Sequence, residues 1–415
     1  MRSSNSTVRV IEKGNLLGPL GQTGISMHCH SLHSKEILDF VPFYAERIPV
    51  LSTVWRRKMR KFQETEGHLP NFNIGYWTPP LSGQQVFESE AASIEKLGLV
   101  PIVSVTDHDS IAAAGEIFEH VPNRFAPISM EWTVPFGHAF FHIGVHNMPE
   151  DRAEELSQQL LDYTFDPNGP DDERLSELFA MMHDIPEMLV VLNHPIWDIE
   201  MIGQQKHETA LREFMRRHGC WIHALEINGF RSMDENNAVT DLAEACGLPL
   251  VSGGDRHCCQ ANTMINVTNA ASFSEFVTEV RIDKRSEVLV LPEYHKPLPS
   301  RQLRSMSQIL GVFPEFPDGR QSWSDRIFFD AEDGLGPRPL TEHWNGQLPG
   351  WTRLAMWALK ALSHDMLVPV LGFTVGDKDI GRSDETTQTP PISFEDIVFA
   401  DPSAFAKQKA LAAGR

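Results

Sequence analysis

Residues 100–110 read VPIVSVTDHDS. Val100–Val105 has the length and apolar character of a buried strand, and the polar residues begin where that strand would end. Directly before it, Phe87–Leu99 carries apolar side chains at helical spacing. The segment predicts a helix, a strand and a polar turn in succession, and this unit indicates the fold class because it recurs.

The same order of apolar run and polar turn returns further along the chain. The runs are LVVL at 189–192, ALEI at 224–227 and LPLV at 248–251, the last after a helix-like stretch at 238–245. Repeated β-α units predict an α/β domain with a mostly parallel sheet. Active sites of such folds form at the carboxyl ends of the strands, so we expect functional residues in the polar turns.

The length of 415 residues and the 41% hydrophobic content allow one large domain with added segments. We expect a polar leader at 1–24, a central domain at 25–284 with an insertion at 39–80, and a C-terminal extension at 285–415. Within the extension, 351–367 reads as a helix and 377–391 as a polar loop.

The charge balance excludes some classes of partner. With 56 acidic and 36 basic residues the net charge is −20, whereas nucleic-acid binders usually present a basic face. We expect no stable nucleic-acid binding, and we interpret the basic run at 56–61 as a solvated helix face. No stretch approaches the roughly 20 apolar residues of a membrane span. Five cysteines without a regular framework, and an N-terminus without an apolar signal segment, predict a cytoplasmic protein.

The first cluster of candidate metal ligands is MHCHSLHS at 27–34. On a strand, residues two apart face the same side, so His28 and His30 would point into one site and Cys29 away from it. Imidazole suits Zn, Mn or Fe. The alternative is a polar strand edge without a metal.

The second cluster is the turn TDHDS at 106–110. His108 is a candidate ligand, and Asp107 could be a further ligand or could orient a histidine. Asp109 or Ser110 could also cap a helix that starts near Ile111.

Two further histidine-rich stretches and a glycine-rich turn complete the set. Glu131 precedes His138, His142 and His146, which share one face if 138–146 is a strand, and we expect one of the three histidines to bind metal. The other candidates are His194, held by a following proline, and Asp255 and His257 after two glycines.

In this order the clusters resemble the PHP domain, the polymerase and histidinol phosphatase superfamily, over about residues 25–260. The matching motifs are H-x-H-S, T-D-H-D, Glu then His, H-P and G-x-D-x-H. The resemblance implies a distorted (β/α)7 barrel that binds two or three divalent metals (Mn, Fe or Zn) and hydrolyses phosphate esters. It implies as metal ligands His28, His30, His108, Glu131, His142, His194, Asp255 and His257, with Glu131 bridging two ions.

One position departs from the resemblance. Many relatives place an aspartate after the first motif to bind a third metal, but Lys35 stands there and cannot ligate while protonated. Glu36 follows, where some relatives use a histidine. Either Glu36 supplies the missing ligand, or the third metal is weak or absent.

The resemblance implies a small anionic phosphate ester as substrate, attacked by metal-activated hydroxide. Lys35 and Arg256 are candidates to hold the phosphate, although Arg256 would face away if Asp255 and His257 face the site. His257 or Asp107 is the candidate general acid.

Three other functions use the same residues. A hydrolase of amides or non-phosphate esters could work on the same metal core, because the ligands do not distinguish these reactions. A non-catalytic metal-binding module is disfavoured by the near-complete ligand set. A nucleic-acid enzyme is disfavoured by the acidic balance.

Overall fold

The computed structural model describes residues 5–11, 21–38, 40–47, 51–331, 333–369, 394 and 397–401. Strands and helices alternate over most of this part, which confirms the predicted α/β class. The polar loop predicted at 377–391 lies outside the described residues.

Two five-stranded sheets form the main body. The first has the order β1 (Asn5–Val10), β12 (Arg285–Val290), β11 (Met264–Thr268), β2 (Thr23–Ser26) and β5 (Val100–Val103). The second has the order β10 (Leu250–Gly253), β9 (Ala224–Asn228), β8 (Leu189–Leu192), β7 (Ala139–His146) and β6 (Met130–Phe136). The strands predicted from the four apolar runs are therefore confirmed. β1 comes from the predicted leader and β12 from the predicted extension, and the two strands pair in the first sheet. The predicted domain division at 24 and 284 stays a prediction.

The expectation of a mostly parallel sheet is wrong. β11 runs antiparallel to both of its neighbours, and so does β7. For β7 the reason is local, because only Gly137 and His138 separate it from β6, and a two-residue connection can join only antiparallel strands. Gly137 has a φ of 61°, a conformation that glycine adopts without strain.

Helices surround these sheets. They are α3 (Gly83–Glu95), α4 (Ala112–Phe118), α5 (Ala153–Thr164), α6 (Asp172–His183), α7 (Gln204–His218), α8 (Met233–Cys246) and α9 (Phe273–Arg281). Buried residues of both sheets, among them Ile25, Ile102, Val191 and Val251, form one apolar cluster with Phe273 of α9. The two sheets thus share an apolar interior.

The described strands form separate sheets, and none of these closes into a barrel. Two isolated bridges, Cys29–Arg256 and His108–Glu131, connect the first sheet to the second beyond the strand ends. Among the described residues, these bridges join the backbones of the two sheets at the edge where the polar turns lie.

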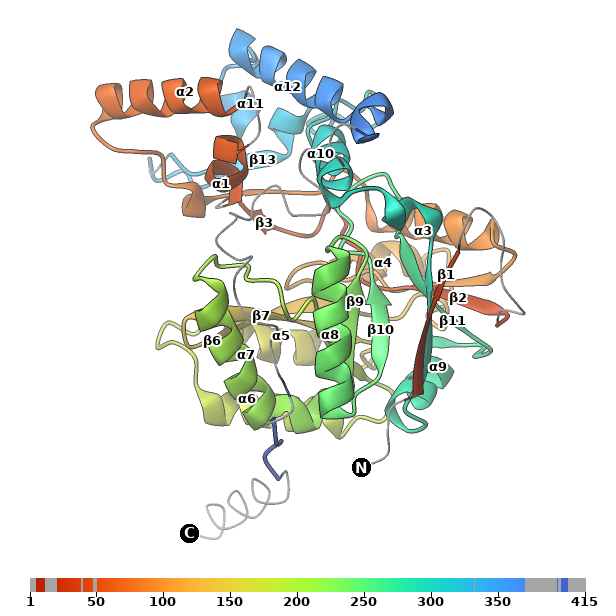
Figure 1. Cartoon of the computed structure of the whole chain (residues 1–415). Helices are drawn as coiled ribbons and strands as arrows, with labels where there is room; N and C mark the ends of the chain where they lie inside the picture. Colours follow the sequence, from red (N-terminus) through yellow and green to blue (C-terminus); the bar gives the residue numbers. More distant parts are fainter. Residues whose placement is uncertain are drawn as a thin grey trace.

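A third, smaller sheet combines the predicted insertion with the C-terminal extension. We call it the cap sheet; its order is β14 (Arg338–Pro339), β13 (Ile327–Phe329), β4 (Gly75–Trp77) and β3 (Glu36–Ile37). Figure 1 shows it at one end of the molecule, together with α1 (Phe40–Arg47), α2 (Leu51–Glu66), α10 (Leu298–Ile309), α11 (Leu340–His343) and α12 (Gly350–Leu362). The helix predicted at 351–367 is confirmed as α12 followed by a 3-10 turn at Asp365–Leu367.

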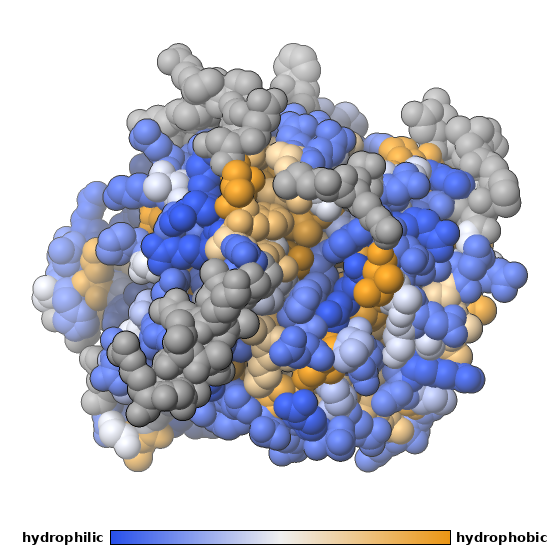
Figure 2. All heavy atoms as spheres, turned by 90° about the horizontal axis from the view of Figure 1, so that it is seen from below, coloured by the Kyte–Doolittle hydropathy of each residue, from blue (hydrophilic) through white to orange (hydrophobic). Residues whose placement is uncertain are grey.

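The surface agrees with the composition. On α2, Arg56, Arg57, Arg60 and Lys61 are exposed, which confirms the predicted solvated face. Figure 2 shows the molecule from below the view of Figure 1, where hydrophilic residues cover most of the surface not drawn in grey. Among the described helices, none has the length and apolar character needed to cross a membrane.

Candidate metal centre

The predicted ligand residues converge at one edge of the two large sheets. His28 and His30 follow β2, His108 follows β5, Glu131 lies in β6, His142 lies in β7, His194 follows β8, and Asp255 and His257 follow β10. Glu36 reaches the same place from β3 of the cap sheet. The two bridges between the large sheets draw these strand ends together.

Glu131 lies at the centre of this arrangement and is fully buried. Its Oε2 lies 3.0 Å from His28 Nε2, 3.4 Å from His30 Nε2 and 3.4 Å from His108 Nδ1. Its Oε1 lies 3.2 Å from His142 Nδ1 and 3.3 Å from His194 Nε2. Because each oxygen faces a different set of imidazoles, this carboxylate has the geometry of a bridge between two ions.

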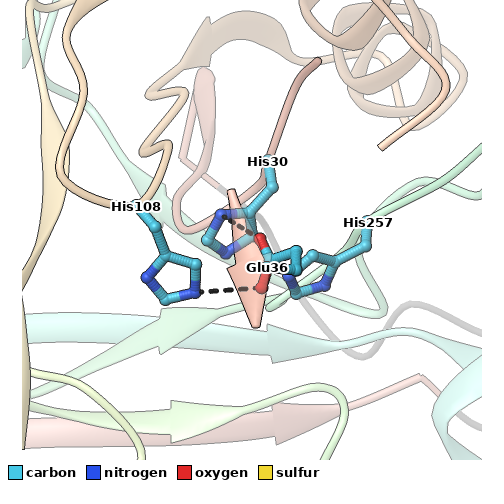
Figure 3. A group of neighbouring side chains, drawn as sticks. All are labelled: His30, Glu36, His108 and His257. Atoms are coloured by element: carbon cyan, nitrogen blue, oxygen red, sulfur yellow. Dashed lines mark ion pairs between the residues drawn. The ribbon is translucent and has the colours of Figure 1, made fainter. Parts of the chain in front are cut away.

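Glu36 lies at the centre of a second group of imidazoles, beside Glu131. Its Oε1 lies 3.2 Å from His257 Nε2, and its Oε2 lies 3.4 Å from His108 Nε2. Figure 3 shows the carboxylate among the imidazole rings of His30, His108 and His257. We call these four residues the Glu36 group; one ligand atom from each lies within 4.8 Å of the others. Glu36 therefore lies where it could supply the carboxylate that the motif lacks at Lys35.

Two further groups meet the same distance criterion: His28, His30 and Glu131, and His108, Glu131 and His142. His108 belongs both to the latter and to the Glu36 group, and His30 belongs both to the former and to the Glu36 group. A neutral imidazole has one nitrogen lone pair, so His108 can bind an ion in only one of the two groups.

The unsatisfied atoms of the site test whether metal ions fit. His28 Nε2, His30 Nε2, Glu131 Oε2, His142 Nδ1 and His257 Nε2 are buried and make no hydrogen bond. Leaving one such group unsatisfied costs about 1–3 kcal/mol, so a cluster of them needs an explanation. Imidazole nitrogens and carboxylate oxygens facing one another are ligands for Zn, Mn or Fe. The residues therefore fit divalent metal ions.

The charges of the buried residues also favour the binding of cations. Burial opposes ionisation of Glu131, but the imidazoles of His28, His142 and His108 outweigh it and hold the pKa of this carboxyl well below its usual range. Burial also opposes protonation of His108, yet the carboxylates of Glu36 and Glu131 raise the pKa of His108 to about 10. Buried carboxylates are stable only beside cations or hydrogen-bond donors, and metal ions are cations of this kind.

Partners of the outer ring nitrogens orient three of the histidines. His28 Nδ1 lies 2.6 Å from Glu226 Oε2, and His257 Nδ1 lies 3.1 Å from the Asp255 carbonyl oxygen. Carboxylate and carbonyl oxygens only accept, so both Nδ1 atoms carry a proton, and in the neutral imidazoles that would bind metal Nε2 is the atom with the lone pair. Ser34 Oγ donates to Glu36 Oε1 at 2.7 Å, so it accepts from His30 Nδ1 at 3.2 Å, which frees His30 Nε2 in the same way.

Glu226, which orients His28, is a residue that the sequence reasoning missed. It lies inside the apolar run ALEI, and its side chain is buried. A Cβ at Gly253 would lie 2.1 Å from the Glu226 carboxylate, so the glycine of β10 leaves the space that this carboxylate fills. A glutamate in the middle of an otherwise apolar strand was the available signal.

Replacing Glu226 by glutamine is expected to weaken metal binding about 10-fold to 100-fold, because the neutral amide orients and polarises His28 less well. Titration of the metal-free protein with Mn²⁺ would measure the change. Glu187→Gln, at an exposed position, is the matched control. Equal affinities in the wild type and the Glu226 variant would contradict the orienting role.

Backbone strain also concentrates at this edge. His28, His194 and Asp255 have φ angles of 61°, 27° and 48°. Residues other than glycine adopt such values at a cost of order 1–3 kcal/mol, and they do so mainly at functional sites. Here the strained turns direct three predicted ligands back toward Glu131.

Asp107 has contacts that favour an orienting role over that of a proton donor. Its carboxylate accepts hydrogen bonds from the backbone N–H of Ser31 at 2.5 Å and from Ser31 Oγ at 2.7 Å, and it is fully buried. These bonds hold the turn that carries His30. Of the two expected caps, Asp109 instead accepts from the Thr133 N–H, whereas Ser110 Oγ accepts from the N–H of Ala112, the first residue of α4, at 3.3 Å.

The two candidate phosphate contacts, Arg256 and Lys35, do not point into the group of predicted ligands in the same way as the histidines. The Arg256 guanidinium pairs with Glu90 at 2.5 Å and donates to the Cys258 carbonyl, so it faces away from Asp255 and His257 as strand alternation predicted. Lys35 is exposed, with its Nζ 5.4 Å from the centre of the Tyr76 ring. The phosphate role of Lys35 stays a prediction, and that of Arg256 is disfavoured.

Of the three histidines near β7, only His142 joins the ligand set. His138 lies exposed in the turn before β7. His146 is buried deeper, with its Nδ1 2.8 Å from Ser104 Oγ. His257 Nε2 faces Glu36 while its Nδ1 is bound to a carbonyl, which favours the ligand role of His257 over that of a general acid.

No protein-family model matches this chain, and no curated protein matches it. Among solved structures, an amidohydrolase from Chromobacterium violaceum with bound sulfate and no metal is similar at a TM-score of 0.32 and 15% identity, over 56% of this chain and 87% of that one. A candidate metal-dependent phosphoesterase from Bifidobacterium adolescentis is similar at a TM-score of 0.32 and 13% identity, over 63% of this chain and 96% of that one. Similarity at this level does not assign a function, so the proposal below rests on the site itself.

Proposed function

We propose that this protein is a metal-dependent hydrolase with the PHP type of metal centre, and that it acts on a small phosphate ester. The observation that carries the proposal is the Glu131 carboxylate, whose two oxygens face five imidazoles from four separate turns and strands. When bound, divalent cations supply Lewis acidity and lower the pKa of a coordinated water.

The chain's own residues would hold two or three ions of Mn, Fe or Zn. His28, His30 and Asp255 surround one side of Glu131, and His142 and His194 surround the other. Glu36, His108 and His257 would hold the third ion, because the one lone pair of a neutral His30 would serve the ion beside Glu131. Glu131 would belong to both ligand sets, and two ions held there would stabilise the attacking and leaving oxygens of a displacement at phosphorus.

Arg231 is a further candidate to hold the phosphoryl group. Its guanidinium stacks on the Trp197 ring at 3.7 Å, and its Nη2 lies 3.8 Å from Asp255 Oδ2. Trp197 in turn lies 5.0 Å from the His194 ring. A guanidinium beside the proposed ions suits a phosphate, which it can bind through two parallel hydrogen bonds. The guanidinium also adds a positive charge at the site, in a chain whose net charge is −20.

We also propose that the strands of the two large sheets that lie within about residues 25–284 are the two parts of a distorted barrel. The bridges Cys29–Arg256 and His108–Glu131 support this, because they lie where a barrel would close. A small-molecule partner fits this arrangement better than a nucleic acid, since the predicted ligands are at most slightly exposed.

A substrate panel tests the reaction. Protein reconstituted with Mn²⁺ is expected to hydrolyse phosphate monoesters or diesters and to leave amides and lactones intact. Turnover of amides or lactones alone would replace the phosphoesterase by the rival hydrolase on the same core. Absence of bound metal by elemental analysis after reconstitution would refute the metal centre itself.

A further inference from the structure

The cap sheet joins two parts of the chain that are far apart in sequence. β3 and β4 come from residues 36–77, and β13 and β14 come from residues 327–339. Its edge strand β3 contains Glu36, a member of the Glu36 group. A predicted metal ligand is therefore carried by a sheet outside the main body.

Register and side-chain alternation connect this sheet to the site. Trp77 pairs with Glu36 on one side and with Ile327 of β13 on the other. The Trp77 ring lies 5.6 Å from the His257 ring, so this face of the sheet is turned toward the Glu36 group. The neighbouring pair, Tyr76 and Phe328, stacks at 4.9 Å on the opposite face.

β3 is too short to hold its own position. It has two residues and pairs only with β4 within the described structure. Such an edge strand depends on its neighbour, because an isolated pair of strands has marginal stability in water. The position of the Glu36 backbone is thus set by β4.

β4 is held in turn by the C-terminal extension. The Thr78 N–H donates to the Arg326 carbonyl oxygen at 2.9 Å, directly before β13. Arg326 is 2% exposed, and its guanidinium donates to carbonyl oxygens of the same extension, including those of Arg320 at 2.7 Å and Ile309 at 2.9 Å. The strand next to β4 is therefore anchored to a tightly bonded loop.

Contact between these strands leaves no room at Gly75. A Cβ there would lie 2.9 Å from the Phe328 carbonyl oxygen and 2.8 Å from Leu38 Cδ1. The φ of Gly75 is −130°, which any residue adopts, so an added methyl group would act only by pushing the strands apart.

We propose that the C-terminal strand β13 is a positioning element of the metal centre, holding Glu36 in place through β4 and so controlling ion occupancy at the Glu36 group alone. This inference rests on the proposed function, and it gives the extension after residue 285 a role. Ser34 fixes the rotamer of the Glu36 carboxylate, while the cap sheet fixes its backbone.

The test is Mn²⁺ binding to the full chain, measured by calorimetry and by elemental analysis at fixed free Mn²⁺. Gly75→Ala is expected to lower the affinity for one Mn²⁺ ion about 10-fold or more, as the loss of a residue that supports a ligand does. The affinities for the other ions are expected to stay unchanged. Gly350→Ala, in α12 of the same extension, is the matched control, since a Cβ there meets nothing within 4 Å. If Gly75→Ala does not fold by circular dichroism, Phe328→Ala, which removes the ring stacked on Tyr76, takes its place.

A double variant distinguishes the positioning role of β13 from the proposed metal centre itself. In a Glu36→Ala background, Gly75→Ala is expected to change Mn²⁺ binding no further, because both changes act on one ion. Additive losses, equal weakening of all ions, or wild-type binding in Gly75→Ala would overturn the positioning role. The positioning role would also be overturned if the Glu36→Ala protein bound as many Mn²⁺ ions per chain as the wild type. A wild type that binds no Mn²⁺ at all would instead refute the proposed metal centre.

Discussion

Glu131→Gln is expected to lower hydrolysis at least about a thousandfold, because metal ions supply several kcal/mol of transition-state stabilisation and each 1.4 kcal/mol is tenfold in rate. The amide keeps the size of the side chain but removes the negative charge that faces five imidazoles. One amide group also cannot offer two anionic oxygens to two ions. Elemental analysis should find fewer bound ions per chain, and the rate should be measured on the best substrate of the panel.

Glu150→Gln is the matched control for this variant, since Glu150 is exposed and lies outside the ligand set. It is expected to keep the wild-type rate and metal content. Near-wild-type turnover by the Glu131 variant would remove this carboxylate from the centre of the mechanism.

Removal of metal by a chelator is expected to abolish activity and to lower the unfolding temperature by several degrees. Ions that bind only the folded chain stabilise it by about 4 kcal/mol at a thousand times their dissociation constant, and this contribution disappears with them. Without ions, the buried atoms of His28, His30 and Glu131 that make no hydrogen bond also lose the partner proposed for them. Thermal unfolding followed by circular dichroism, with and without added Mn²⁺, measures the effect.

The Glu131→Gln protein should show a much smaller shift on chelation, because it is expected to hold fewer ions. An unfolding temperature and a rate that do not change in wild-type protein shown to be metal-free would contradict the proposal. Recovery of both on adding Mn²⁺ back would exclude irreversible damage by the chelator.

The convergence of His28, His194 and Asp255 was predictable, because polar turns after strands meet at one edge of an α/β fold, whereas Glu131, inside β6, was expected there from the family resemblance. His142 was preferred over its neighbours by its motif, and the structure places it in the ligand set. These positions depend on local order along the chain, which hydrophobic runs and turn residues reveal.

Other features depend on contacts between distant segments. The run ALEI predicts the strand that carries Glu226, but not that Gly253 on the next strand leaves space for its carboxylate beside His28. The pairing of Arg231 with Trp197 and Asp255, across three separate turns, has no counterpart in the spacing of these residues. The antiparallel course of β11 also depends on how the chain returns to the sheet, which local pattern does not record.

By itself, the amino-acid sequence determined the α/β class and the strands that end in polar turns, because periodicity is a local property, and the resemblance of its motifs supplied the expected ligand set. Only the tertiary structure decided that Glu36 faces His257, that Arg256 pairs with Glu90, and that β13 pairs with β4 in the cap sheet. Each of these depends on side chains or strands separated by more than a hundred residues, or on which way a turn directs its side chain. Such relations arise only when burial of the apolar interior brings the segments together.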